Sequence, residues 1–254
     1  MRVVAVVNQK GGAGKTAAAV HVAASLVKMG LRVLLIDMDA QGNAGTCLGL
    51  QKDGSALLDV LRGQRTLVSA VEPSPHGVDV VCGGPALEGL DVVLFMAKKG
   101  LATFTLKQAL HEAPPNWDFI LIDCPPNLGT ATASALVAAT EVLIPVQAGG
   151  EALEGVGRLN ANIEEVKAVN PKLRVVGVLP CMTKKGEVLT TLVESTLQET
   201  FGELVFPVSI GRNTKIGQAY VMRQPMHAFD KKSPSVKQYD AVARELVARG
   251  EGHL

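Results

Sequence analysis

Asn8-Gln9-Lys10-Gly11-Gly12-Ala13-Gly14-Lys15-Thr16 occupies residues 8–16 and combines four small residues with two lysines. An apolar run at residues 3–7 precedes it, and the alanine-rich residues 17–20 that follow favour a helix. A strand, a glycine-rich turn and a helix N-terminus form the setting in which backbone N–H groups and the helix dipole bind phosphate. The stretch therefore predicts a phosphate-binding loop, in which Lys15 reaches the terminal phosphates and Thr16 ligates magnesium.

The loop departs from the general pattern G-x-x-x-x-G-K-[ST] at its start. Gln9 stands where the first glycine belongs, and Lys10 lies at the mouth of the loop. We still expect the whole turn and the first helical residue to surround a nucleotide. The expected nucleotide-binding residues in this part of the chain are Lys10, Gly11, Gly12, Ala13, Gly14, Lys15, Thr16 and Ala17.

The composition favours one α/β domain over residues 1–254. Of the 254 residues 47% are apolar and only 4% are aromatic, which predicts an aliphatic core. No apolar run approaches the roughly 18 residues that would indicate a membrane span. Four widely spaced cysteines, without a C-x-x-C pair, favour a reduced cytosol over a disulfide framework or a zinc site.

Apolar runs of strand length alternate with helical patterns along most of the chain. The runs at 32–36, 78–82, 119–122, 142–146, 175–179 and 204–208 predict strands, and 15–29, 101–112, 129–139, 152–168, 187–200 and 235–249 predict helices. Continuous Val/Ile/Leu strands indicate a sheet that is covered on both faces. We therefore predict a doubly wound, mainly parallel sheet flanked by helices, with a ligand crevice at the carboxyl ends of the strands. Residues 51–77 are the least regular, and we expect a surface insertion there.

Three aspartates follow two of the predicted strands. Asp37 and Asp39 end the strand at 32–36, and both can reach the crevice if the extended chain continues. Asp123 follows four apolar residues, as in a Walker B strand, whose carboxylate holds magnesium through water. Carboxylates and water are the ligands that magnesium accepts. The three side chains predict magnesium coordination and the orientation of an attacking water.

The pattern K-G-G-x-G-K-T at residues 10–16 resembles the deviant Walker A loop of the ParA/MinD family of ATPases. Residues 37–41 are similar to that family's D-x-D-P-Q motif, with Ala40 in place of the proline, and residues 123–126 fit D-x-P-P. The resemblance implies that Lys10 reaches the nucleotide of a second copy, so that an ATP-dependent homodimer is the active form. It also implies that Asp39 positions the attacking water, that Asp37 supports the magnesium shell, and that ATP, ADP and magnesium are the cofactors.

The same resemblance places the adenine near Met182 and Asn213. Two departures lie in this part of the chain. The family commonly has a proline where Gly211 stands, and it often has bulky aromatic residues where Gly149 and Gly150 stand.

The segment 212–237 is strongly basic although the whole chain has a formal net charge of only +1. Six basic residues face one acidic residue, Asp230, which gives the segment a charge of +5. Such a stripe attracts a nucleic-acid backbone without reading sequence. Within it, residues 231–235, just before the last predicted helix, resemble the basic stretch that short, Soj-like ParA proteins use for nonspecific DNA. The expected DNA-binding residues are Arg212, Lys215, Arg223, Lys231, Lys232 and Lys237.

These observations predict a cytoplasmic, nucleoid-associated ParA-type ATPase. It would bind nonspecific DNA as an ATP dimer, release it on hydrolysis and depend on a ParB-like centromere-binding or adaptor protein. The alternative is a MinD-like membrane-associated positioning ATPase, which needs a basic amphipathic terminal helix. The polar face of the helix at 235–249 mixes both charge signs, so we expect it to dock on its own core without stable membrane association. A small-molecule ligase or kinase is a further alternative. A redox protein like the nitrogenase iron protein is not expected, because residues 80–84 precede the Walker B strand and do not fit the position of its iron–sulfur ligands.

Overall fold

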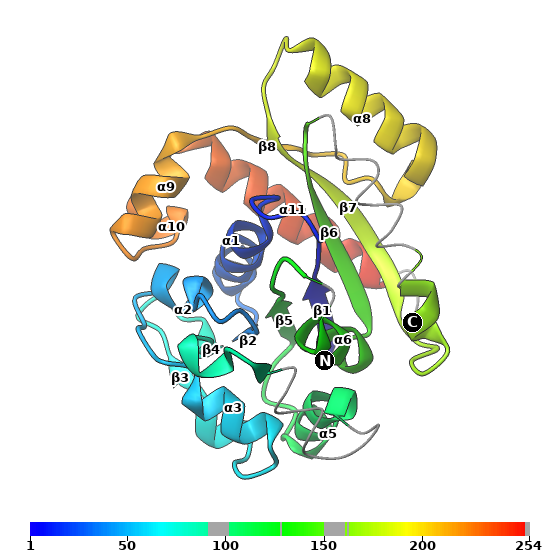
Figure 1. The fold of residues 1–254 in the computed structure, drawn as a ribbon. Coiled ribbons are helices and arrows are strands. Elements are labelled where there is room, and N and C mark those ends of the chain that lie inside the picture. The colour runs from blue at the N-terminus through cyan, green and yellow to red at the C-terminus, as the bar shows by residue number, and fades with distance from the viewer. Residues whose placement is uncertain (91–101, 128, 150–160, 162, 252–254) are drawn as a thin grey trace.

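The structure is a computed structural model that describes residues 1–90, 102–127, 129–149, 161 and 163–251. Among these residues, eight strands form one sheet in the order β3-β4-β2-β5-β1-β6-β7-β8 (Figure 1). Every neighbouring pair is parallel except β3–β4 at one edge. The strands are β1 Arg2–Val6, β2 Val33–Asp37, β3 Glu72–Pro73, β4 Asp79–Val81, β5 Phe119–Asp123, β6 Glu141–Gln147, β7 Arg174–Thr183 and β8 Ile210–Gly211.

Helices cover both faces of this sheet. The α-helices are α1 Lys15–Lys28, α2 Asn43–Cys47, α3 Ser55–Leu61, α5 Thr105–Glu112, α6 Thr130–Ala138, α8 Val188–Phe201, α9 Thr214–Val221, α10 Met226–Phe229 and α11 Pro234–Glu251. Short 3-10 helices are η1 Val68–Ala70, η2 Pro85–Leu87, η3 Ala102–Phe104 and η4 Gly202–Leu204. α1 and α11 lie side by side and contact each other, and α5 and α6 form a second contacting pair (Figure 1).

Alternation along the strands divides the core into two layers. In β2, Val33 and Leu35 belong to the cluster formed with α1 and α11, whereas Leu34 and Ile36 belong to the cluster formed with α3, α5 and α6. Successive side chains of a strand point to opposite faces, so a strand buried on both sides must be apolar throughout. The unbroken apolar runs of the sequence follow from this arrangement.

The doubly wound parallel fold is confirmed, with boundaries shifted by one to four residues. The helix expected at 101–112 begins at Thr105 after η3, and the one at 187–200 is α8. The strand predicted at 204–208 is wrong: the chain there forms η4 and one isolated bridge from Val205 to Val178, and the edge strand is β8. The helix at 152–168 falls mostly outside the described residues. That residues 1–254 form one domain stays a prediction.

Residues 51–77 are not a surface insertion. They contain α3 and η1, and Leu57, Val60 and Leu61 of α3 are all at most 2% exposed within the core. Leu67 and Ala70 extend the same layer. The spacing of the apolar residues, at positions i, i+3 and i+4, is that of a helix face. The segment therefore completes one face of the sheet.

The C-terminal helix docks on the sheet, as expected. Tyr239, Val242, Ala243 and Leu246 of α11 are at most 2% exposed and join the α1 layer. Because this apolar face is already buried, the helix presents mainly its polar side to the surroundings. Among the helices in the described ranges, none combines the length and apolarity that a bilayer crossing requires.

A buried carboxylate fastens the end of α11 to the sheet. Glu141, at the start of β6, is 3% exposed and pairs with Arg2 at 2.7 Å and with Arg174. Arg2 also donates to the backbone oxygen of Leu246 at 2.7 Å, and Arg174 donates to that of Arg249 at 3.2 Å. The N-terminal strand and the C-terminal helix are thus held by the same two arginines.

We expect Glu141→Gln to lower the free energy of unfolding by about 2–4 kcal/mol, because it leaves two partly buried arginines without their counter-charge. Urea unfolding followed by circular dichroism measures the change. Glu245→Gln is the control, since it breaks only an i,i+4 pair with Arg249 on α11 and should cost no more than about 0.5 kcal/mol. Equal losses in the two variants would contradict the assignment.

Candidate functional site

The loop between β1 and α1 has the backbone of a phosphate-binding turn. Gly12 and Gly14 have φ values of +74° and +92°, in the left-handed region that glycine adopts without strain. Gly14 directly precedes α1, whose N-terminus receives no hydrogen bond from a capping side chain. The first N–H groups of a helix have no partner within the helix. They are therefore available to an anion, and the helix dipole favours its negative charge.

Asn8 fixes the start of this loop. Its amide nitrogen donates to the backbone oxygen of Pro145 in β6 at 2.6 Å, and its Oδ1 accepts from the N–H of Lys10 at 2.9 Å. Asn8 is 4% exposed, so both bonds are shielded from water. The loop is consequently tied to a second strand before it turns into α1.

The two lysines of the loop have different surroundings. Lys15 is 7% exposed and its Nζ donates to the backbone oxygen of Lys10 at 3.2 Å, inside the turn. Burial lowers its pKa, and Asp123 opposes that shift most strongly. The ammonium of Lys10 instead lies 3.9 Å from the position that a Cβ on Gly149 would occupy, after β6. Lys15 therefore lies within the phosphate loop, while Lys10 reaches the loop that follows β6.

Asp123 ends β5 and is fully buried, and neither carboxylate oxygen accepts a hydrogen bond of good geometry from the described part of the chain. Burial, and next the nearby Asp37, raise its pKa well above the usual range, while the Thr16 hydroxyl and Lys15 oppose the rise. A buried carboxylate without donors is costly unless a cation compensates it. Its oxygens and the hydroxyl of Thr16 are the donor types that magnesium takes, so the residues present fit that ion.

Asp37 lies beside Asp123 in the register of β2 and β5, but its oxygens are already in use. Oδ1 accepts from the N–H of Asp39 at 3.1 Å, and Oδ2 accepts from that of Ala44 at 2.9 Å and that of Gly45 at 3.4 Å. Burial raises the pKa of Asp37 to about 7 despite these bonds. The contacts make Asp37 an anchor for the start of α2. Its support of a magnesium shell stays a prediction.

The extended chain that was the condition for Asp37 and Asp39 to lie along one strand does not continue past Asp37. The strand ends at Asp37, and the chain turns so that the N–H of Asp39 bonds back to the Asp37 side chain. Asp39 is half-buried, and its Oδ1 accepts from the N–H of Gln41 at 2.9 Å. A side-chain-to-backbone bond two residues ahead is how aspartate forms a turn. Asp39 therefore sits on a loop beyond the strand, and its water-positioning role stays a prediction.

Gly83 and Gly84, which sequence reasoning left without a role, lie under this loop. A Cβ on Gly83 would overlap the backbone oxygen of Asp39 and lie 2.6 Å from that of Asp37. A Cβ on Gly84 would lie 2.7 Å from the backbone oxygen of Lys52. A glycine pair one residue after the end of β4 is the available signal of such a close backbone approach.

Met182 and Asn213, the expected adenine contacts, have distinctive local structures. Met182 has a φ of +56° where the β7–β8 register breaks, a strained conformation that clusters at functional sites. Its neighbour Cys181 lies 3.6 Å from the position of a Cβ on Gly14. Asn213 caps α9 through the N–H of Lys215, and its amide nitrogen donates to Ser233 at 3.0 Å and Ser235 at 2.9 Å. Both adenine contacts stay predictions, and Asn213 also has a structural role.

The basic segment 212–237 forms α9, α10 and the start of α11. All six expected DNA-binding residues are exposed. Lys215 pairs with Asp230 at 2.6 Å, and Asn213 links α9 to the start of α11. Lys215 lies in α9 and Lys237 in α11, whereas the other four lie in the segments that flank or connect α9, α10 and α11.

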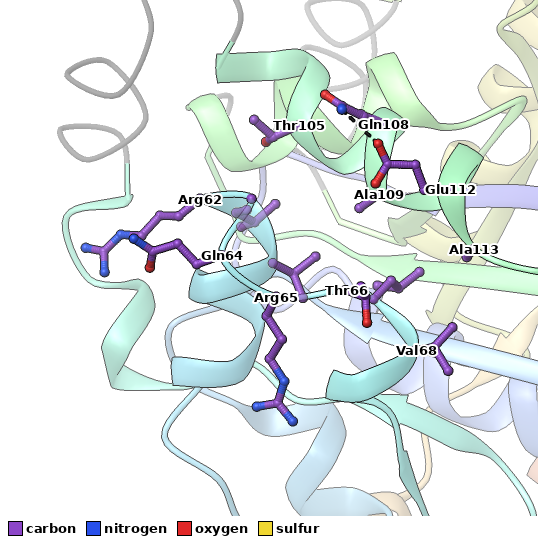
Figure 2. A pocket seen from close by; sticks show the side chains of 14 residues that line it. Arg62, Gln64, Arg65, Thr66, Val68, Thr105, Gln108, Ala109, Glu112 and Ala113 are labelled. Atoms are coloured by element: carbon purple, nitrogen blue, oxygen red, sulfur yellow. Dashed lines mark hydrogen bonds between the residues drawn. The ribbon is translucent and has the colours of Figure 1, made fainter.

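A cavity of about 530 Å³ lies elsewhere, between the α3–η1 region and α5 (Figure 2). Its lining includes Leu61, Leu67 and Ala109, and Gln108 donates to Glu112 at 2.8 Å along its α5 side. None of its lining residues belongs to the phosphate loop or to the carboxyl ends of β2 and β5. We assign it no part in the site.

Comparisons with known proteins agree with this geometry. A family model described as an AAA domain matches residues 1–175. The chromosome partitioning protein ParA of Myxococcus xanthus is 36% identical over 252 residues, which cover 98% of this chain and 88% of that protein. The chromosome-partitioning ATPase Soj of Thermus thermophilus is 38% identical over 250 residues, covering 98% and 96%. Cobyrinic acid a,c-diamide synthase from Mycobacterium smegmatis, solved with an ATP analogue and magnesium, has a TM-score of 0.86 at 30% identity and covers 100% and 97%.

We expect Asp123→Asn to raise the melting temperature of the metal-free protein at pH 8 by several degrees, since about 1 kcal/mol shifts it by 2–4 °C in a chain of this size. The folded pKa of Asp123 lies above the unfolded value, so ionisation of this group destabilises the fold as the pH rises past the unfolded pKa. The wild type should therefore lose more stability than the variant between pH 5 and pH 8 in EDTA.

Asp118→Asn is the control for this comparison. Arg32 lowers the pKa of Asp118 to about 2, so that this exposed carboxylate stays ionised between pH 5 and pH 8. Its removal should leave the pH dependence in that range unchanged. A lower melting temperature of Asp123→Asn at pH 8 in EDTA would contradict the account.

Proposed function

Because this chain belongs to the ParA/MinD family of ATPases and resembles its short ParA and Soj members, we propose that it is a positioning ATPase that binds DNA as an ATP dimer. Hydrolysis of ATP would release the DNA, and a ParB-like or adaptor protein would stimulate that step. The observation that carries the ATPase part is the buried carboxylate of Asp123, which accepts no hydrogen bond of good geometry within the described residues and lies beside Lys15, Thr16 and the N-terminus of α1.

The residues of the site would divide the chemistry between them. The loop N–H groups and Lys15 would bind the phosphates and stabilise the charge that develops on them. Asp123 and Thr16 would hold magnesium, which neutralises phosphate charge and orients the terminal phosphate for in-line attack. Asp39 would position the attacking water, and Asp37 would keep the Asp39 loop in place through α2. The ATP analogue and magnesium bound to the relative from Mycobacterium smegmatis support this assignment.

The different positions of the two lysines support a dimer. Lys15 already lies in the phosphate loop of its own chain, where it bonds to the Lys10 carbonyl. The Lys10 ammonium lies near Gly149, beyond that loop. We infer that Lys10 contacts the nucleotide of a second copy when two loops face each other, and so makes dimerisation depend on ATP.

The basic segment supplies the DNA part of the proposal. Its six exposed cations lie in α9, in α11 and in the segments next to α9, α10 and α11, and they would neutralise phosphates without reading bases. The proposed location is therefore the cytoplasm, in association with the nucleoid.

The docked α11 weighs against the membrane alternative. Its apolar face packs on α1 and the sheet, so inserting that face into lipid would require the helix to leave the core. The ligase alternative has one observation in its favour, the name of the synthase to which the chain is similar at 30% identity. The curated relatives with 34–38% identity that carry ParA or Soj names favour partition.

Lys10→Ala should abolish ATP-dependent dimerisation while leaving ATP binding to the monomer, because Lys15 and the loop N–H groups remain. Size-exclusion chromatography with light scattering, with ATP and with ADP, measures the dimer. Lys52→Ala is the control, since Lys52 pairs with Glu72 at 3.2 Å away from the loop. A Lys10→Ala protein that still dimerises with ATP would refute the role of Lys10.

Binding to a mixed-sequence DNA duplex should require ATP and fall steeply with salt. Asp39→Ala, which we expect to bind ATP without turnover, holds the ATP state during the fluorescence anisotropy measurement. Replacing Lys231 and Lys232 by alanine should reduce the slope of log K against log salt by about 1.8, because two phosphate contacts are lost.

The pair Lys107→Ala and Lys172→Ala is the charge-matched control for that variant, since both lysines are exposed outside the basic segment. It should change the slope little. A wild type that binds anionic vesicles with ATP, and DNA not at all, would favour the membrane alternative and overturn the proposal.

A further inference from the structure

α2 directly continues the loop that carries Asp39. The N–H of Gly42 donates to the backbone oxygen of Asp39 at 3.1 Å, and Gly42 enters α2 with a φ of +61°. The Asp37 carboxylate accepts from the N–H groups of Ala44 and Gly45, the second and third residues of α2. A movement of the Asp39 loop must therefore move the start of α2, because only three residues separate Asp39 from Asn43.

The opposite side of α2 contacts the end of α9. The Tyr220 hydroxyl donates to Oδ1 of Asn43, the first residue of α2, at 2.7 Å. Beyond α2, a Cβ on Gly49 would lie 3.6 Å from the backbone oxygen of Arg223. His76 also forms a hydrogen bond with the backbone of Arg223. Burial lowers the pKa of His76, and this bond opposes that lowering. The last turn of α9 is thus seated on α2 and on the turn before β4.

The backbone of Arg223 is strained at the point where the end of α9 packs against α2 and the turn before β4. Its φ is +55°, in the left-handed region where a non-glycine residue is disfavoured. Two bonds close the helix around it, from the N–H of Arg223 to the oxygen of Tyr220 at 2.9 Å and from that of Gln224 to Ala219 at 3.0 Å. A strained residue persists where the surrounding structure fixes it. The end of α9 therefore has a defined position relative to α2.

We propose that α2 couples the nucleotide site to the basic segment, with the Asn43–Tyr220 hydrogen bond as the link. The proposal rests on the function proposed above. When the Asp39 loop rearranges around the terminal phosphate, Gly42 and Asn43 move with it, and Tyr220 carries the displacement into α9. Arg212 and Lys215 at the start of α9, and Arg223 at its end, then change position together. Tyr220 and Asn43 are positioning residues and do not touch the nucleotide.

Tyr220→Phe tests the link, because it removes only the hydroxyl and keeps the ring. DNA affinity is measured with a non-hydrolysable ATP analogue and with ADP. We expect the ratio of the two affinities to fall about fivefold, which is what one neutral hydrogen bond carries. The affinity for ATP and the basal hydrolysis rate should not change. Val221→Ala, a substitution at the exposed neighbouring position of α9, should leave the ratio as in the wild type.

A double-mutant cycle with Asn43→Ala separates a specific link from general damage. Each single variant should reduce the ratio, and the double variant should reduce it no further than either one. Additive losses, or an unchanged ratio in Tyr220→Phe, would overturn the proposal.

Hydrogen exchange of the α9 amides keeps this test independent of DNA. In the wild type the ATP analogue and ADP should give different protection at residues 214–221, and Tyr220→Phe should remove that difference. If the wild type shows this difference but binds no DNA, the coupling stands and the DNA part of the proposed function fails. If α9 shows no nucleotide-dependent difference in the wild type, the coupling is refuted.

Discussion

Two carboxylates are buried next to each other at the ends of β2 and β5, and the surrounding loops are built around them. Asp37 and Asp123 are paired in the strand register, and both are fully buried. Like charges in such a place raise each other's pKa and oppose folding unless something compensates them. Backbone N–H groups from the loop and from α2 compensate Asp37, whereas Lys15 and Thr16 are the groups that favour the charged form of Asp123 within the described residues. The phosphate loop, the Asp39 loop and α2 all lie around these two carboxylates. A bound cation would compensate the charge of Asp123.

Much of the fold could be predicted because its strands are buried on both faces. That burial requires continuous apolar runs, which mark β2 and β5 in the sequence, and the left-handed glycines mark the loop before α1. α3 is hard to predict because it has only seven residues and glycines lie close to both of its ends. The turn after Asp37 could not be predicted, because the N–H of Asp39 bonds there to the Asp37 side chain and no residue pattern shows such a bond. The link from Tyr220 to Asn43 spans 177 positions and depends on tertiary packing alone.

The distribution of charge separates two tasks within one molecule. Cations that serve the structure are buried or paired, as Arg2 and Arg174 are with Glu141. Cations of the basic segment are exposed in and next to α9, α10 and the first turn of α11, at the other end of α11. α11 takes part in both, because its first turn adjoins the basic segment and its last turns are held by the arginines. Because its last turns are held by the arginines, α11 provides a fixed support for the surface charges next to its first turn.

The bond from Arg2 to Leu246 joins residues 244 positions apart, and this separation bears on how the chain is made. Synthesis at 5–20 residues per second takes roughly ten to fifty seconds for a chain of this length. β1 and α1 emerge first, yet the helix that covers their outer layer emerges last. During that interval the alanine-rich face of α1 has no native cover, and contacts of such long range form slowly. The apolar layer over α1 therefore stays open to other apolar surfaces until α11 has been synthesised.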